Sequence, residues 1–155
     1  MNRHLSRVII MQTLYEWDFR PKTDVAEIKK RNIENYHEDI DDDYIQKMIE
    51  NVISKIKEID EQITSAAPEW PLEQIAGIDK TILRIAICEI LYRDDIPPKV
   101  AINEAVELGK TFGGENSSKF INGVLGTVYR QCARYNKEED EKTSTNKKEE
   151  TDDKK

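Results

Sequence analysis

Two segments of this chain carry apolar side chains on every side of a helical wheel, and this pattern restricts the fold to a bundle of helices. The segments are residues 3–19 and residues 78–92. A helix that is apolar all round must be covered by other helices. The chain has no sustained period-2 alternation and no hairpin dipeptide between β-branched runs, so strands are not expected. The sequence therefore predicts an all-α fold with these two helices in the interior.

Other segments are apolar on one side only. A short helix is expected from Asp24, as the N-cap residue, to Tyr36, and another is expected over 98–112, between prolines and glycines. Apolar residues from Ile45 to Ile63 recur at spacings of four and three, which predicts one long amphipathic helix that begins near 43 and ends before Pro68. A coiled coil is the alternative, but the run spans fewer than three heptads.

The last helix is expected to begin at Asn116 or Ser117 and to run to about Tyr135. Each of the last two helices is expected to direct one row of apolar side chains toward the core. In helix 98–112 this row is Ala101, Ala105, Leu108 and Phe112. In the last helix it is Ile121, Val124, Leu125, Val128 and Cys132. After them, residues 137–155 contain no apolar side chain and are predicted to be disordered. We therefore expect one helical domain over 1–136 and a charged tail over 137–155.

The sequence shows no signature of a catalytic, metal or cofactor site. Phosphate-binding, dinucleotide-binding, zinc-protease and serine-hydrolase motifs are all missing. Cys88 and Cys132 lie in apolar helical patterns, and with His4 and His37 they do not form metal-ligand spacing. No apolar run approaches the roughly 20 residues that span a membrane, and the first residues do not resemble a signal peptide. The expectation is a cytoplasmic protein without a membrane segment.

Charge is distributed unevenly along the chain. The formal net charge is −7, yet residues 24–61 alone contain six basic and twelve acidic groups. Residues 1–23 and 99–136 are mildly basic. The two ends of the predicted domain can therefore form a local anion-binding surface despite the overall charge.

Two glycines in the last helix need an explanation, because each costs roughly 1 kcal/mol relative to alanine. At about 100° per residue, one strip away from the apolar face holds Lys119, Gly123, Gly126 and Arg130. The strip is bare backbone between two cations, which suits close approach of an RNA phosphate backbone, with Phe120 nearby as a stacking face. Alternatively, the glycines permit a tight helix crossing opposite Gly109. Residue spacing leaves both explanations open.

Charged residues on the two interior helices also allow two interpretations. Arg3 and Arg7 share a helix face with His4 nearby, which is typical either of a basic surface or of a solvated helix end. Asp79 and Glu89 either meet a basic protein partner or form the polar side of their helix.

Four stretches resemble the family of the transcription antitermination factor NusB: QTLYEWDF (12–19), IDKTILRIAICEIL (78–91), IPPKVAINEAVELGKTFG (96–113) and SSKFINGVLG (117–126). They follow one another in the family's order and cover most of residues 3–130. The resemblance implies an all-α fold of about seven helices in two packed bundles, with no enzymatic activity and no cofactor. It also implies binding to single-stranded boxA RNA of nascent ribosomal transcripts together with the ribosomal protein NusE. RNA polymerase and other Nus factors would complete this complex, which reads through terminators.

By motif position, the resemblance implies an RNA face formed by Arg3, His4, Arg7, Lys99, Asn116, Lys119, Phe120 and Asn122. It implies a NusE face formed by Tyr15, Asp79, Arg84 and Glu89. Two departures from the family are visible. His4 and Leu5 stand where arginine is expected, which lowers the electrostatic affinity for RNA, and Asn116 stands where aspartate is familiar, which removes a repulsion from phosphate.

Two other classes of function compete with this one. NusB-like domains also occur attached to ribosomal RNA cytosine methyltransferases, but this chain carries no cofactor motif. A helical adaptor that binds only proteins is the other alternative. Loss of RNA binding on replacing Lys119 and Phe120 together would favour the RNA-binding reading over the adaptor.

Overall fold

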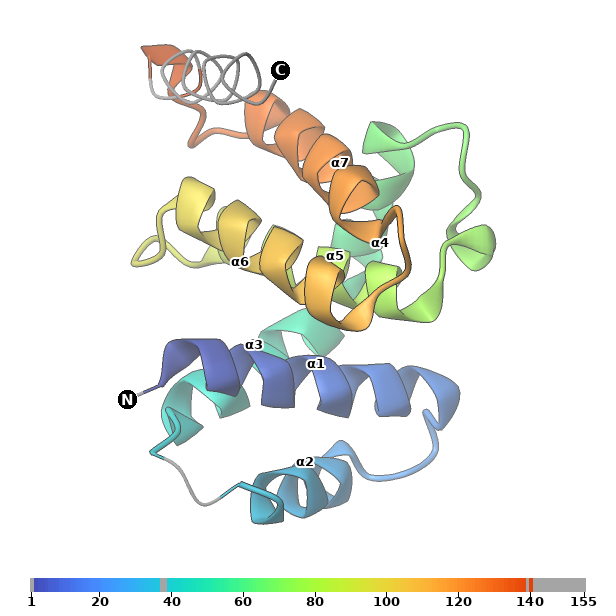
Figure 1. Ribbon diagram of the computed structural model, residues 1–155, viewed down its shortest axis with the longest axis vertical. Helices are drawn as coiled ribbons and strands as arrows, with labels where there is room; N and C mark the ends of the chain where they lie inside the picture. The colour runs from blue at the N-terminus through green and yellow to red at the C-terminus, as the bar shows by residue number, and fades with distance from the viewer. Residues whose placement is uncertain (1, 37–38, 139, 141–155) are drawn as a thin grey trace.

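The computed structural model describes residues 2–36, 39–138 and 140, and within them the chain is helical (Figure 1). The α-helices are α1 (Arg3–Phe19), α2 (Val25–Glu34), α3 (Asp42–Ser54), α4 (Ile56–Ala66), α5 (Gly77–Tyr92), α6 (Pro98–Phe112) and α7 (Ser117–Gln131), and a 3-10 helix, η1 (Leu72–Gln74), precedes α5. A parallel bridge joins Asn2 and Ile40. The predicted all-α fold is confirmed for this part of the chain.

Some expectations concern residues outside the described part. The structure does not describe residues 37–38 of the acidic linker. It also does not describe residues 139 and 141–155, which make up most of the predicted tail. Within the described residues, no helix combines the length and apolar character that crossing a bilayer requires.

The two helices predicted to lie inside the bundle are buried. In α5, eleven of sixteen residues are buried, and the helix packs against α1, α3, α4, α6 and α7. In α1, the buried residues run almost without a break from Ser6 to Leu14. A helix with apolar residues on every side has no face to offer to water, so neighbours surround both.

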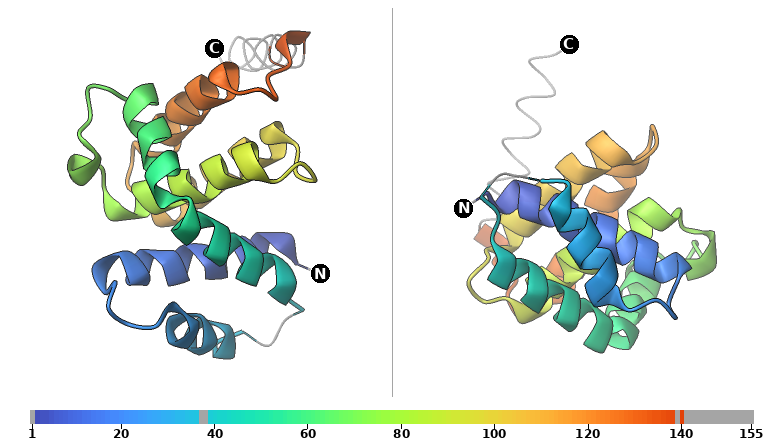
Figure 2. Two further views of the ribbon diagram at one scale, coloured as in Figure 1. Left: turned by 180° about the vertical axis from the view of Figure 1, so that it is seen from behind. Right: turned by 90° about the horizontal axis from the view of Figure 1, so that it is seen from below.

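The remaining helices form two bundles that share α5. Helices α2 and α3 pack on α1, whereas α4, α6 and α7 pack around α5 (Figure 1). Seen from behind, α3 lies over α1 and α4 continues toward α7 (Figure 2). The chain therefore passes from the first bundle to the second between α3 and α4.

The prediction of one long helix from about 43 to before Pro68 was wrong. The helix breaks at Lys55, which adopts φ −107° and ψ 15°, so α3 ends at Ser54 and α4 begins at Ile56. The apolar spacing continues through the break, because both halves bury one face. However, α3 packs on α1 while α4 packs on α7, and a straight helix would not follow both surfaces. Tertiary packing therefore decides the break.

Two expectations for the last helices need correction. Phe112, predicted to point inward, is 38% exposed at the end of α6. Helix α7 ends at Gln131 rather than near Tyr135, and Cys132 lies half-buried beyond it. After this early stop the chain folds back over the end of α5, where the guanidinium of Arg134 donates to the carbonyl oxygens of Glu89, Ile90, Arg93, Asp94 and Ile96 at 2.8–3.4 Å. The last carbonyls of a helix have no partner within it, so Arg134 acts as the cap of α5.

Candidate nucleic-acid interface

A hollow of about 390 Å³ lies between the start of α7 and the segment that leads into α5. We call it the α5–α7 hollow; its lining is Trp70, Gln74, Ile75, Ala76, Asp79, Gly114, Asn116, Ser117 and Phe120. The rings of Trp70 and Phe120 meet edge to face, with centroids 6.2 Å apart. Trp70 is 51% exposed, so an aromatic face remains open to a ligand. Aromatic faces in a hollow of this kind suit the stacking of an unpaired base.

The turn between α6 and α7 holds Asn116 at the mouth of the α5–α7 hollow. The hydroxyl of Ser117 accepts a hydrogen bond from the backbone N–H of Gly114 at 2.8 Å. A Cβ on Gly113 would lie 2.4 Å from that hydroxyl oxygen, so this position requires glycine. Asn116 occupies the N-cap position of α7, but its side chain makes no capping hydrogen bond. The exposed side-chain amide of Asn116 therefore takes no part in capping the helix.

Asp79 belongs to the same hollow. Its Oδ1 atom is buried and has no hydrogen-bond partner among the described residues. The residue lies in the first turn of α5 and is 9% exposed. The structure therefore places Asp79, which the resemblance assigned to the NusE face, beside Asn116 and Phe120 of the RNA set.

The structure distinguishes between the two explanations for the glycines of α7. A Cβ on Gly123 would meet nothing within 4 Å, and one on Gly126 would meet only the side chain of Arg130. The tight crossing belongs to Gly109 alone, where a Cβ would lie 2.8 Å from Cδ1 of Ile121. Gly123 and Gly126 therefore lie on the open side of α7, and the helix crossing does not explain them.

Replacing Gly123 with alanine is expected to raise the free energy of unfolding by about 0.5–1 kcal/mol, because the added methyl group finds open space and the unfolded chain loses freedom. Replacing Gly109 with alanine, the matched control, is expected to lower it, because Ile121 must move. Urea denaturation measures both. Destabilisation by Gly123→Ala would mean that this glycine has an internal packing role after all.

The basic residues at the start of α1 do not join the α5–α7 hollow. Figure 1 shows α1 beginning on the left and α7 on the right, and α1 packs on α2, α3 and α5. Arg3 is partly exposed, hydrogen-bonds Asp41 at 3.2 Å and lies 4.0 Å above the ring of Tyr44. The exposed His4 ring lies 3.0 Å from a carboxylate oxygen of Glu104 on α6. An RNA strand that contacts both the basic start of α1 and the α5–α7 hollow must therefore cross the face of the molecule between them.

Arg7 does not have the exposure that an RNA contact requires. It is buried, and its guanidinium donates to both carboxylate oxygens of Glu89 at 3.0 and 2.9 Å. Although burial opposes the charge, the hydrogen bond and the charge of Glu89 raise the pKa of Arg7 above its ordinary value. The hydroxyl of Tyr44 donates to the same carboxylate at 2.8 Å. We therefore leave Arg7 out of the proposed RNA surface.

Lys99 lies at the other end of α7 from Lys119. Its ammonium group bonds Asp140 at 3.1 Å and sits 5.1 Å above the ring of Tyr129. Phe120 and Tyr129 are nine positions apart in α7, which corresponds to roughly 14 Å along the helix axis. Lys119 itself is exposed, and Asn122 is half-buried. Of the predicted RNA residues, the structure thus gathers Asn116, Lys119 and Phe120 at the start of α7.

Two residues of the predicted NusE face are internal. Glu89 is 1% exposed and is held by Arg7 and Tyr44. Arg84 is buried and bonds the carboxylates of Asp18 and Asp60. Partial burial opposes the charge of Asp18, but hydrogen bonds from Lys80 and Arg84 hold its pKa below the ordinary value. The expectation that Arg84 and Glu89 contact a partner directly is therefore not supported by their burial; they join helices within the bundle.

Tyr15, the remaining residue of that set, is half-buried and reaches the surface beside a residue that sequence reasoning missed. Its ring meets the ring of Phe19 edge to face at 4.9 Å, and both lie against Gly77 at the start of α5. Phe19 is 66% exposed. In sequence it reads as an apolar helix residue, and only its place in the last turn before Pro21 indicates exposure. Trp70 was missed in the same way, although a tryptophan between Pro68 and Pro71 is typical of an exposed loop.

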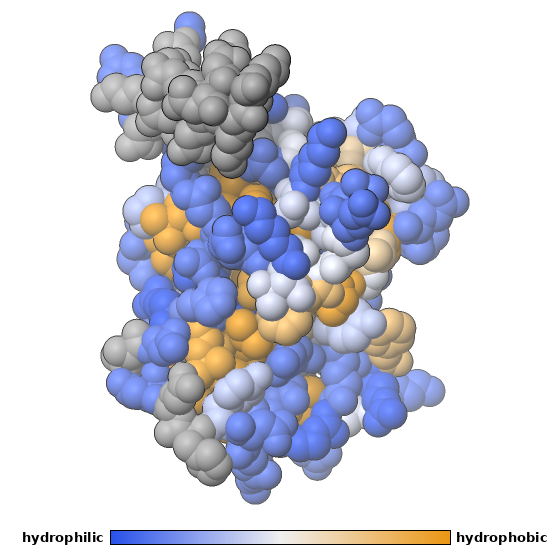
Figure 3. All heavy atoms as spheres, in the orientation of Figure 1, coloured by the Kyte–Doolittle hydropathy of each residue, from blue (hydrophilic) through white to orange (hydrophobic). Residues whose placement is uncertain are grey.

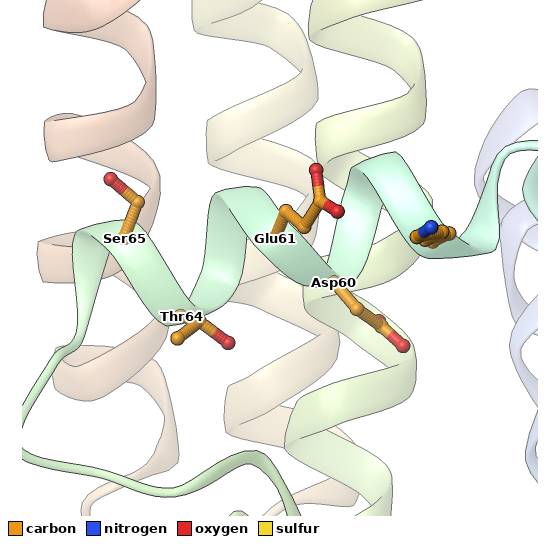
Figure 4. Close-up of a pocket in the computed structure, with 5 residues that line it drawn as sticks. Asp60, Glu61, Thr64 and Ser65 are labelled. Atoms are coloured by element: carbon orange, nitrogen blue, oxygen red, sulfur yellow. The ribbon is translucent and has the colours of Figure 1, made fainter.

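The rest of the surface offers weaker candidates. A shallow hollow lies along α4, lined by Lys57, Asp60, Glu61, Thr64 and Ser65 (Figure 4). Its side chains come from one helix, and Asp60 is already bonded to Arg84. Figure 3 shows hydrophobic atoms at the surface along the seam between α1 and α6, on an otherwise mostly hydrophilic face. Among the described residues, no cluster of His, Cys, Asp or Glu is arranged to hold a metal ion.

Comparison with known proteins gives consistent matches. The family model described as the NusB family matches residues 4–130. The transcription antitermination protein NusB of Oceanobacillus iheyensis is 41% identical over 128 residues, which cover 83% of this chain and 98% of that protein. The protein of the same name from Dehalococcoides mccartyi strain CBDB1 is 41% identical over 132 residues, covering 85% and 92%.

Solved structures agree with the sequence matches. The structure of T. maritima NusB superposes with a TM-score of 0.77 at 30% identity, covering 91% of this chain and 98% of that chain. A crystal structure of the antitermination factors NusB and NusE in complex with double-stranded RNA gives a TM-score of 0.73 at 25% identity, covering 82% and 95%.

Proposed function

The chain belongs to the NusB family, and on this basis we propose that it is a transcription antitermination factor that binds boxA RNA of nascent ribosomal transcripts together with NusE. In this role it helps RNA polymerase, with other Nus factors, to read through terminators. The named relatives are antitermination proteins, and the protein is accordingly a regulator and not an enzyme. We further propose that it acts in the cytoplasm, through a helical domain over 1–136 with 137–155 as a tail.

The α5–α7 hollow is the observation that carries the RNA part of this proposal. It combines the open ring of Trp70 with Phe120, and the exposed Lys119 begins the strip that Gly123 leaves bare. Stacking on aromatic rings and a nearby cation are what a single strand requires of a protein surface. Neutral Asn116 at the mouth avoids the repulsion that a carboxylate would exert on phosphate. We place Arg3 and His4 at a second, separate contact on the same strand, and Lys99 and Asn122 at its margins.

We propose that NusE binds at the far end of α1. The aromatic pair of Tyr15 and Phe19 forms an exposed apolar projection there, packed on Gly77. Aromatic residues are enriched at the energetic centres of protein interfaces. Gly77 begins α5 two residues before Asp79, so the NusE contact and the α5–α7 hollow lie next to each other. This arrangement supports joint binding of NusE and RNA.

Replacing Phe19 with alanine is expected to weaken NusE binding about tenfold or more, because an exposed aromatic side chain is lost from the centre of the contact. The melting temperature is expected to change little, since Phe19 is already 66% exposed in the folded protein. Isothermal titration with NusE measures the affinity, and Tyr92→Ala, which removes another exposed aromatic residue on the opposite end of α5, is the matched control. Equal affinities of Phe19→Ala and the parent would place NusE elsewhere.

The test of the proposed function is a fluorescence anisotropy titration of labelled boxA RNA with the full chain, with and without NusE, at two salt concentrations. Binding is expected to weaken with salt and to tighten when NusE is added. The double variant Lys119→Ala with Phe120→Ala is expected to lose RNA binding, both with and without NusE. If no RNA binding appears even with NusE present, the protein is an adaptor for proteins and the RNA proposal fails.

A further inference from the structure

The chain folds back after α7 and brings a carboxylate to Lys99. We call residues 132–138 and 140 the post-α7 segment; in Figure 1 it is drawn in red, on the same side of the molecule as the start of α6. The carboxylate of Asp140 accepts a hydrogen bond from the ammonium group of Lys99 at 3.1 Å and another from the hydroxyl of Tyr135 at 3.3 Å. The Lys99 side chain is 26% exposed and that of Asp140 is 19% exposed. A pair shielded in this way is screened less by salt than an exposed one.

Contacts with α7 hold the post-α7 segment in this place. The backbone N–H of Asn136 donates to the hydroxyl oxygen of Tyr129 at 3.0 Å, and the rings of Tyr129 and Tyr135 meet edge to face with centroids 5.2 Å apart. Tyr129 is 1% exposed, and the Lys99 ammonium lies 5.1 Å from the centre of its ring. The N–H of Asp140 donates to the carbonyl oxygen of Asn136 at 3.1 Å. Lys99 and the residues that carry Asp140 therefore rest on the same core side chain.

The position of Lys99 favours anions in general. Lys99 lies in the first turn of α6, where the helix dipole adds to the positive potential of the ammonium group. A carboxylate and a phosphate are both anions that accept charge-assisted hydrogen bonds from an ammonium group. The post-α7 segment is itself acidic near this point, because positions 137–140 hold three acidic residues and one basic residue. Asp140 and an RNA phosphate would therefore repel each other and compete for Lys99.

We propose that Asp140 makes an autoinhibitory contact: it occupies Lys99 in the free protein, and an RNA phosphate displaces it when the complex forms. The inference rests on the proposed RNA function and on Lys99 as a margin of the RNA surface. It adds a competitor that lies beyond residue 130, where the family match ends. Displacement releases a carboxylate, which gathers counter-ions again, while the ammonium group gains a phosphate. RNA affinity is therefore lower, and less dependent on salt, than an unoccupied Lys99 would give.

A purely structural ion pair is the other explanation for this contact. The anchors of the post-α7 segment favour a displaceable carboxylate, because they do not use it. Arg134 bonds the carbonyl oxygens at the end of α5, and the backbone N–H of Asn136 bonds Tyr129. The segment can therefore stay attached to the domain when Asp140 leaves Lys99.

The experiment titrates labelled boxA RNA with the full chain and with Asp140→Asn, in the presence of NusE and at several salt concentrations. Fluorescence anisotropy gives the affinities. The variant keeps the shape of the side chain and removes its charge. RNA binding is expected to tighten about threefold, because no ion pair has to be broken, and the slope of log affinity against log salt concentration is expected to become steeper by about 0.7. In a Lys99→Ala background, Asp140→Asn is expected to bring no gain.

Glu138→Gln is the matched control, because it removes one negative charge from an exposed position of the same segment. It is expected to bind RNA like the parent. If Asp140→Asn binds no more tightly than Glu138→Gln, or if its gain persists in the Lys99→Ala background, Asp140 does not compete for Lys99 and the inference is overturned. A lower melting temperature of Asp140→Asn with unaltered RNA affinity makes the pair structural and overturns it too. If neither the parent nor any variant binds RNA with NusE present, the proposed function itself fails.

Discussion

Replacing Glu89 with alanine is expected to lower the free energy of unfolding by about 3–5 kcal/mol, because the buried guanidinium of Arg7 loses both hydrogen-bonded carboxylate oxygens and keeps only Glu104, at 3.9 Å, as a counter-ion among the described residues. Glu89 is 1% exposed and joins α5 to Arg7 of α1 and to Tyr44 of α3. A charge buried without a partner costs far more than an exposed ion pair contributes. The loss of this one carboxylate therefore loosens the contact between three helices.

Urea denaturation followed by circular dichroism measures the effect of Glu89→Ala. Asp43→Ala, which breaks the exposed pair of Asp43 with Lys47, is the matched control and is expected to change stability by less than about 1 kcal/mol. The double variant Arg7→Met with Glu89→Leu is expected to recover part of the loss, because neither member leaves a buried charge. A loss no larger than that of Asp43→Ala would show that water reaches Arg7 in the folded protein.

Replacing Trp70 with alanine is expected to weaken boxA RNA binding by about 1–3 kcal/mol, since one stacking platform for a base is lost. The exposed indole contributes little to the core, so the melting temperature is expected to stay within a few degrees. The dependence of affinity on salt is expected to remain unchanged, because stacking releases no counter-ions. In contrast, Lys119→Ala is expected to change the salt dependence: the slope of log affinity against log salt concentration is expected to become shallower by about 0.7, because one phosphate contact is lost.

Anisotropy titrations at several salt concentrations measure both variants. Tyr92→Ala removes another exposed aromatic side chain, at the far end of α5, and serves as the control for Trp70→Ala. If Trp70→Ala and Tyr92→Ala bind RNA equally well, the α5–α7 hollow does not hold a base.

Helix positions were predictable where burial repeats along the chain, but the break at Lys55 was not. The apolar spacing from Ile45 to Ile63 indicates which side of a helix is buried, but it does not indicate which neighbouring helix covers that side. Helix α3 packs on α1 and α4 packs on α7, and this exchange of partners depends on contacts that are distant in sequence. The end of α7 was likewise set by the distant carbonyl oxygens that Arg134 binds.

Site residues were predictable from the sequence only where their exposure depends on their position in their own helix and not on a contact with another helix. Lys119 and Gly123 share an open strip of α7, as their spacing indicated: both are exposed, and a Cβ on Gly123 would meet nothing within 4 Å. Arg7 has the same sequence signature as an exposed arginine, but its partner Glu89 lies 82 positions away. No local pattern reports such a pair, so burial of the charge became visible only in three dimensions.

The cap on α5 has a consequence for the order in which the protein is made. Arg134 closes a helix whose last residue is Tyr92, about forty positions earlier in the chain. During translation, the end of the central helix therefore lacks the hydrogen bonds that Arg134 donates to the carbonyl oxygens of Glu89 and Ile90 until this arginine has left the ribosome. Because domains fold as units while the chain is synthesised, we expect ribosome-bound chains in which this arginine has not yet emerged to be cleaved by added protease near the end of α5, and chains in which it has emerged to resist cleavage there.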